Sequence, residues 1–159
     1  MHAFFYDTWA FVALANARDP QHALAAEIDA ALEASGRAAV TSDFVLDETI
    51  TLLHVAAGAR VAVEWIDGIE ARARGDDLQL VDVSRTRRAA ALALFRRLAQ
   101  GSPRLSFTDC TSFAIMRELG IELAFTADRH FLAAGGSVRP IVERVGRRWR
   151  SVLGSFLSK

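Results

Sequence analysis

Cysteine, lysine and proline are scarce in this sequence. Its 159 residues include one cysteine and three prolines, and lysine occurs only at the last position, Lys159. The lone Cys110 excludes an internal disulfide and a cysteine-based metal cluster, and it is typical of a protein of the reducing cytoplasm. Because nearly all basic side chains are arginines, any phosphate must be held by arginine, although genomic base bias is the simpler explanation of an arginine-rich composition.

Long apolar runs are also absent. No run approaches the roughly 20 residues that a membrane-spanning helix needs. The first residues, MHAFFYDTWAF, lack a basic segment and carry an acid at position 7, so we expect no signal peptide. We therefore expect a cytoplasmic protein with no membrane segment.

The composition is that of a folded globular domain. Apolar residues make up 52% of the chain and charged residues 24%, and the length predicts one domain. Net charge is zero, but residues 1–70 contain 11 acids and 3 arginines, whereas residues 71–159 contain 8 acids, 15 arginines and Lys159. The chain is therefore strongly dipolar along its length.

Short apolar runs alternate with longer amphipathic segments. We expect strands at residues 3–7, 37–42, 78–83, 121–128 and 138–142. We expect helices at residues 8–16, 19–36, 43–58, 59–75, 84–101 and 108–120. This alternation predicts an α/β fold in which helices cover both faces of a mostly parallel sheet.

Four acids follow or flank these predicted strands at one end of the sheet. Asp7 directly follows the first strand, and Asp128 follows the apolar run LAFTA. Asp109 begins a helix, and Glu48 lies about a turn and a half into the helix after the second strand. Because ligands bind beyond the carboxyl ends of parallel strands, these acids can converge on one pocket.

A pocket of carboxylates favours a bound divalent cation. Close carboxylates repel one another and raise their own pKa values unless a cation offsets the repulsion. Oxygen ligands without histidine or cysteine favour Mg²⁺ or Mn²⁺ over zinc. Such a site supports hydrolysis of a phosphodiester by water whose pKa the metal lowers. Thr108 and Thr126 would then cap or orient the acids.

Simpler explanations exist for the individual acids. Asp109 is also explained as an acid favoured by a helix dipole, and Asp128 as an N-cap or turn residue. Of the neighbours Asp47 and Glu48, one must be a solvated helix acid. His130 is expected at the surface rather than in the pocket. Asp7 is the hardest to explain as a surface residue, because it ends the aromatic strand FFYD.

Three segments together resemble a known family. They are FFYDTWAFVAL, VLDETITLL and LSFTDCTSFAIMRELGIELAFTADRHF, within residues 3–142. The chain thereby resembles the PIN domain, the nuclease fold of VapC-like toxins of toxin–antitoxin modules. The last segment is the most specific, since this family has an Asp-initiated helix, a Gly-Ile turn, a strand and a second Asp.

The resemblance carries specific implications. It implies a three-layer α/β/α sandwich, with Asp7, Glu48 and Asp109 as metal-binding acids, Asp128 as the fourth acid, and Thr8, Thr108 and Thr126 as supporting hydroxyls. It further implies Mg²⁺ or Mn²⁺ dependence, cleavage of RNA, homodimerisation and inhibition by a small antitoxin. Residues 1–142 would form the nuclease domain. Arginines that could attract the RNA backbone, most of them expected to be solvated, are Arg85, Arg87, Arg88, Arg96, Arg97, Arg104 and Arg117.

Residues 143–159 extend beyond the family pattern. We expect a basic amphipathic helix there, whose apolar face comprises Trp149, Val152, Leu153, Phe156 and Leu157. The expected role is packing against the same domain or a dimer mate; contact with RNA or an antitoxin is the alternative.

Other enzyme classes lack required residues. A phosphotransfer receiver needs an internal lysine, and a dehalogenase-type phosphatase needs a second aspartate two residues after the first. No glycine-rich phosphate loop or G-x-S-x-G elbow is present. A toxin, an RNA-processing nuclease without an antitoxin, and a non-catalytic RNA- or protein-binding module on the same fold all stay open.

Overall fold

A five-stranded parallel sheet forms the centre of the protein. The structure is a computed structural model that describes residues 3–133, 138–142 and 149–158. The strands are β1 (Ala3–Tyr6), β2 (Ala38–Ser42), β3 (Gln79–Val81), β4 (Leu123–Phe125) and β5 (Arg139–Pro140). They lie in the order β3-β2-β1-β4-β5, and every pair is parallel. The expected mostly parallel sheet is confirmed.

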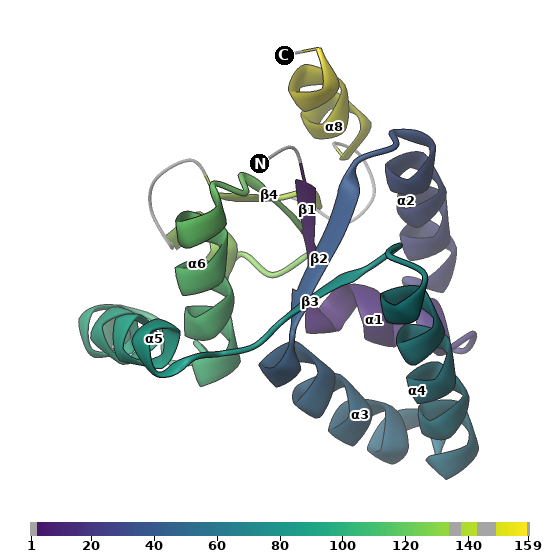
Figure 1. Cartoon of the computed structure of the whole chain (residues 1–159), viewed down its shortest axis with the longest axis horizontal. Coiled ribbons are helices and arrows are strands. Elements are labelled where there is room, and N and C mark those ends of the chain that lie inside the picture. The colour runs from purple at the N-terminus through teal and green to yellow at the C-terminus, as the bar shows by residue number, and fades with distance from the viewer. Residues whose placement is uncertain (1–2, 134–137, 143–148, 159) are drawn as a thin grey trace.

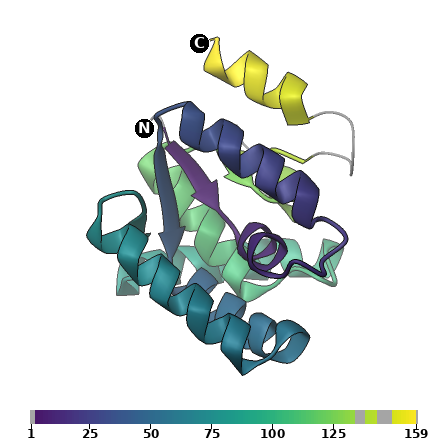
Figure 2. The same cartoon turned by 90° about the vertical axis from the view of Figure 1, so that its right-hand side faces the viewer.

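Helices cover both faces of this sheet, which gives the three-layer sandwich (Figures 1 and 2). On one face lie α5 (Arg85–Leu98) and α6 (Phe107–Leu119), and on the other lie α1 (Thr8–Ala15), α2 (His22–Ala34) and α4 (Ala59–Arg74). Helix α3 (Asp43–Ala57) lies beyond the carboxyl ends of the strands. No helix among the described residues is long and apolar enough to span a membrane.

Local sequence explains where the main helices begin and end. Ser42 caps α3 by accepting a hydrogen bond from the Val45 amide, and Ser84 caps α5 in the same way. Helix α6 ends at Gly120, whose φ of 64° lies in the left-handed region that glycine tolerates best. Ser42 and Ser84 therefore set where α3 and α5 begin, and Gly120 sets where α6 ends.

The predicted elements occur, with shorter strands than expected. The strand expected at residues 121–128 extends only over Leu123–Phe125, because the Thr126 amide donates a hydrogen bond back to the Ala124 oxygen and so turns the chain. The last residues of the helix expected at 84–101 form a separate short helix, η1 (Ala99–Gly101). Helix α7 (His130–Ala133) was not anticipated, because a single turn is too short to produce a helical periodicity in the sequence.

The C-terminal segment packs on the domain at the amino end of the strands (Figures 1 and 2). Helix α8 (Trp149–Leu157) buries Leu153, which is 4% exposed, while Trp149 and Val152 pack against the core. Arg150 forms an ion pair with Glu27 of α2. Residues 143–148 of the predicted extension, and the Phe156 side chain, lie outside the described residues.

Replacing Leu153 with alanine should destabilise the protein. Leu153 contacts the core of the domain, so its truncation is expected to lower the free energy of unfolding by roughly 2–3 kcal/mol. Leu157→Ala is the matched control, because Leu157 is 41% exposed. Urea unfolding measures both; equal small effects would show that α8 does not pack on the domain.

Candidate active site

The strand order creates a crevice between β1 and β4. Strands β2 and β3 lie on one side of β1, whereas β4 and β5 lie on the other. Ligands of parallel sheets bind beyond the carboxyl ends of the strands, where the strand order reverses in this way. Asp7 follows β1 and Asp128 follows β4, so both acids emerge at this switch point.

Asp7 is buried beneath the crevice and anchored from the neighbouring strand. Its Oδ2 accepts a 2.8 Å hydrogen bond from the Thr126 hydroxyl, and the residue is 4% exposed. Asp7 is the N-cap residue of α1, yet its side chain makes no capping bond. Burial raises the pKa of Asp7 to about 7, the Thr126 hydrogen bond opposes this rise, and repulsion from Asp109 and Glu48 adds to it.

Glu48 approaches Asp7 from α3. The Thr8 hydroxyl, one residue after Asp7, donates a 2.6 Å hydrogen bond to Glu48 Oε2. Glu48 is half-buried, whereas its neighbour Asp47 is exposed to solvent. Of the two adjacent acids, Asp47 is therefore the solvated one.

Asp109 enters the site from the first turn of α6. The Ser106 hydroxyl accepts a hydrogen bond from the Asp109 amide at 2.9 Å, and Asp109 Oδ2 accepts one from the Ser106 amide at 2.8 Å. This capping box gives Asp109 the helix-terminal role that its sequence position also suggested. Burial raises the pKa of Asp109 to about 6, to which the charges of Asp128 and Glu48 contribute.

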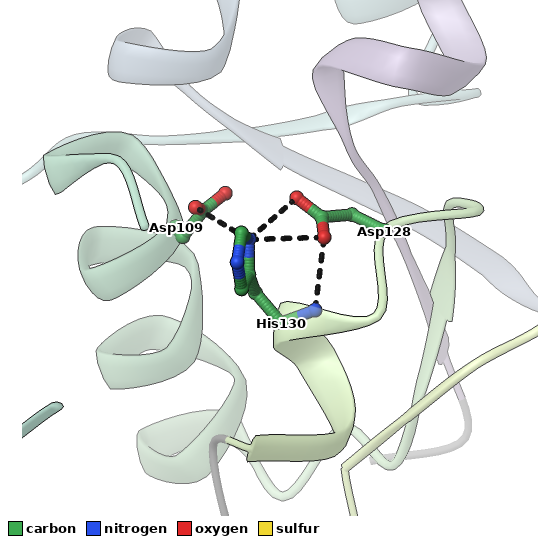
Figure 3. Close-up of side chains that lie close together, drawn as sticks. All are labelled: Asp109, Asp128 and His130. Atoms are coloured by element: carbon green, nitrogen blue, oxygen red, sulfur yellow. Dashed lines mark hydrogen bonds and ion pairs between the residues drawn. The ribbon is translucent and has the colours of Figure 1, made fainter. Parts of the chain in front are cut away.

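Asp128 lies close to Asp109 and is held by a tight turn (Figure 3). Its Oδ1 accepts a 2.8 Å hydrogen bond from the His130 amide, so the turn interpretation of Asp128 also applies. Its own amide donates a 3.0 Å hydrogen bond to the Thr126 hydroxyl. Thr126 thus contacts two of the four acids.

His130 belongs to the site, contrary to the expectation of a surface residue. Its Nδ1 lies 3.1 Å from Asp128 Oδ1 and 3.8 Å from Asp109 Oδ2. Figure 3 shows the imidazole between the two carboxylates. The one-turn helix α7 turns the ring inward, and nothing in the sequence periodicity indicated this helix.

The four predicted acids line one cavity of about 500 Å³. It is lined by Asp7, Thr8, Trp9, Val12, Asp19, Glu48, Leu52, Arg104, Ser106, Asp109, Ala127 and Asp128. Ser106 and Asp19 were not anticipated. The S-x-x-D spacing before α6 would have identified Ser106 as the N-cap, whereas no sequence signal pointed to Asp19.

Two of the three expected threonine hydroxyls support acids. Thr8 donates to Glu48, and Thr126 donates to Asp7. Among the described residues, Thr108 instead contributes its main-chain oxygen, which accepts from the Thr111 hydroxyl. Thr108 is therefore part of the first turn of α6 rather than an orienting hydroxyl.

The donor set fits a divalent cation. Ligand atoms of Asp109, Asp128 and His130 lie within 4.8 Å of one another, and Asp7 and Glu48 line the same cavity. Carboxylate oxygens suit Mg²⁺ and Mn²⁺. The sequence suggested oxygen donors alone, but the donors gathered here also include a His130 nitrogen, which Mn²⁺ accepts more readily than Mg²⁺ does.

In metal-free protein, stability should decrease as the pH rises. Folding raises the pKa of Asp7 from its ordinary value near 4 to about 7, so the native state binds more protons across this window. The free energy of unfolding is then expected to fall between about pH 4 and pH 7. Asp7→Asn should flatten this decline and stabilise the protein at pH 8 by roughly 1–3 kcal/mol.

Urea unfolding in EDTA at several pH values measures this effect. Asp47→Asn is the control, because it removes one negative charge at an exposed position. Parallel pH profiles for wild-type protein and Asp7→Asn would contradict the burial of a charged Asp7.

Comparisons with known proteins agree with this architecture. The PIN domain profile matches residues 4–136. The 23S rRNA-specific endonuclease VapC20 of Mycobacterium tuberculosis, from strains CDC 1551 / Oshkosh and ATCC 25618 / H37Rv, is 36% identical over 141 residues, covering 86% of this chain and 98% of the relative.

A solved structure gives the same result. The crystal structure of M. tuberculosis VapC20, described as a Sarcin-Ricin loop cleaving toxin, superposes with a TM-score of 0.67 at 34% identity, covering 86% of this chain and 99% of the other. The relatives are thus matched over nearly their whole length. This chain belongs to the PIN domain family and is VapC-like.

Proposed function

We propose that this protein is an endoribonuclease that hydrolyses RNA with a divalent cation, Mg²⁺ or Mn²⁺, and that it is the toxin of a toxin–antitoxin pair. The observation that supports this most is the convergence of four acids from four distant segments on one cavity, in a chain 36% identical to a 23S rRNA-specific endonuclease. Asp7, Glu48, Asp109 and Asp128 are the proposed metal-binding and catalytic residues.

Each proposed ligand has a partner that orients it. Thr126 orients Asp7, and Thr8 orients Glu48. The Ser106 amide orients Asp109, and the His130 amide orients Asp128. When bound, a divalent cation lowers the pKa of water and neutralises charge on the scissile phosphate. The buried carboxylates, whose pKa values are raised by burial, are stabilised in their charged form by such a cation.

We further propose that the substrate is 23S ribosomal RNA. M. tuberculosis VapC20 is named for that substrate and described as cleaving the Sarcin-Ricin loop. A ribosomal substrate also implies action in the cytoplasm. A synthetic hairpin of this loop is the first RNA to assay.

Replacing Asp109 with asparagine should abolish cleavage. The substitution keeps the size of the side chain and removes a ligand charge, so the rate is expected to fall about 100-fold or more. EDTA should have the same effect on wild-type protein. The measurement is cleavage of the hairpin, with Mg²⁺ or Mn²⁺, by identically purified proteins.

Asp47→Asn is the matched control for this assay, because Asp47 is an exposed acid outside the cavity. It should cleave at the wild-type rate. Equal activity of the Asp109 variant would mean that the site is wrong or that a contaminating nuclease is measured.

Two alternatives use the same fold. A non-catalytic RNA- or protein-binding module would cleave no RNA, and Mn²⁺ would not raise its melting temperature through the acids. An RNA-processing nuclease without an antitoxin would cleave RNA but would not arrest growth when expressed. Growth arrest that depends on Asp109 favours the toxin.

The proposed antitoxin site is a second, larger cavity of about 840 Å³ beside α1 and α4. Trp65 of α4 lines this cavity, and its ring also packs edge-on against Phe11 at 5.3 Å. Gly68 lines the cavity one turn further along the same helix, and nothing lies within 4 Å of an added Cβ there. We also propose a homodimer, with exposed Leu52, Val55 and Val63 of α3 and α4 as the contact surface.

Gly68→Arg should prevent antitoxin binding without unfolding the protein. The arginine side chain would occupy the cavity, while the helical position itself accepts a side chain. Light scattering is expected to give a dimer of the 17.4 kDa chain alone, and a larger complex when antitoxin is added to wild-type protein only. Leu92→Arg is the control for antitoxin binding, because Leu92 of α5 is exposed and lies outside both the cavity and the proposed dimer surface. Antitoxin binding by Gly68→Arg would contradict the assignment.

Finally, we propose that residues 1–142 form the nuclease domain and residues 143–159 a C-terminal extension. The packing of Leu153 against the core supports a structural role for the extension. The Leu153→Ala experiment described above tests this role.

A further inference from the structure

Within the part of the chain that the structure describes, Arg104 is the only arginine that lines the acid cavity. The other charged residues of its wall are Asp7, Asp19, Glu48, Asp109 and Asp128. The remaining wall is partly apolar, with Trp9, Val12 and Leu52. A strand of RNA, which carries a negative charge at every phosphate, therefore meets one fixed cation among five acids at this cavity.

The main chain at Arg104 is held by a tight turn. The Leu105 amide donates a 2.9 Å hydrogen bond to the Ser102 oxygen, which closes a turn with Pro103 and Arg104 at its two central positions. Proline is favoured at the first of these positions because its φ is preset. Leu105 is buried at 8% exposure, and Ser106 then caps α6. Arg104 is thus attached to a rigid support two residues before the cap that holds Asp109.

Arg104 is available for a ligand. It is exposed to solvent and forms no ion pair with any residue in the described ranges. Other arginines are engaged: Arg60, Arg74, Arg87 and Arg150 each pair with a glutamate. Each of the five acids of the cavity instead accepts a hydrogen bond from a hydroxyl or an amide of another residue.

We propose that Arg104 binds a phosphate of the RNA strand at the mouth of the acid cavity and so positions the neighbouring scissile bond. This inference rests on the proposed nuclease function. A guanidinium offers two parallel N–H donors to phosphate oxygens, and it cannot lose its charge. The positive charge of Arg104 also reduces the repulsion between the five acids of the cavity and the negatively charged RNA. A divalent cation would offset only two of those five negative charges. Arg104 is therefore a substrate-binding residue, distinct from the acids.

The test compares Arg104→Ala with Arg104→Lys and Arg74→Ala. Arg74 is a charge-matched control, since it is exposed, lies at the end of α4 and is absent from the cavity wall. Binding of the sarcin–ricin hairpin is measured by fluorescence anisotropy in the Asp109→Asn background, so that the RNA stays intact. KM and kcat are measured in the wild-type background, and melting temperatures are recorded for all variants.

Arg104→Ala should weaken binding about tenfold or more, because a charge-assisted contact is lost. The slope of log K against log salt concentration should fall by about 0.7, the value for one phosphate contact on a single strand. In cleavage, KM should rise while kcat changes little. Arg104→Lys should keep the salt slope and recover part of the affinity, and Arg74→Ala should behave as its parent.

A purely structural role for Arg104 would lower the melting temperature and leave the salt slope unchanged, and this result would overturn the proposal. Equal KM values for Arg104→Ala and Arg74→Ala, in a wild-type background that cleaves the hairpin, would overturn the Arg104 contact and leave the nuclease function intact. If wild-type protein neither binds nor cleaves any RNA, the nuclease function fails and the Arg104 contact fails with it.

Discussion

Parallel pairing of β1 with β4 is the contact on which the site depends. Tyr6 pairs with Phe125 in this register, and their rings pack edge-on at 5.2 Å. The next residues, Asp7 and Thr126, then come together although 119 positions separate them. A slip by one residue would turn Thr126 to the other face of the sheet and remove the donor that holds Asp7. The buried apolar strands therefore fix the geometry of the most buried acid.

Burial and position at a helix N-terminus shift the pKa values of Asp7 and Asp109 in opposite directions. Asp7 precedes the first turn of α1, and Asp109 lies in the first turn of α6, where the positive end of a helix dipole stabilises a negative charge. Thr126 and Ser106 also donate to the two carboxylates. Even so, burial prevails and raises both pKa values. Burial of these two carboxylates therefore lowers the stability of the folded protein when they are charged, which is a common cost of function.

Helix α1 connects the two cavities of the protein. Trp9 and Val12 line the acid cavity, whereas Phe11 and Leu14 line the larger one. Residues three and four apart share a helix face, so this eight-residue helix presents a different face to each cavity. The Phe11 ring of α1 also packs against two neighbouring elements. Its centroid lies 5.6 Å from that of Tyr6 in β1 and 5.3 Å from that of Trp65 in α4. A molecule in the larger cavity thus contacts the helix whose N-cap residue is Asp7.

Much of the fold follows from the sequence because local and global preferences agree. Short apolar runs, separated by amphipathic helices, already predict a parallel sheet covered on both faces. Asp7 directly follows the run AFFY, and Asp128 directly follows the run LAFTA. The same reasoning placed four acids at one sheet edge, since it depends only on element order and on the acids' positions along the chain. The PIN resemblance came separately, from three sequence motifs.

The sequence by itself determined the element order, the sheet edge and the acids found there. Tertiary structure decided which side chains complete the site. His130 reaches Asp109 and Asp128 only because a single turn of helix follows Asp128, and Arg104 reaches the cavity only because a buried Leu105 anchors its turn. Thr8 supports Glu48 while Thr108 supports none of the acids, although each hydroxyl lies beside an acid in sequence. These distinctions depend on side-chain directions across non-local contacts, which neither periodicity nor composition encodes.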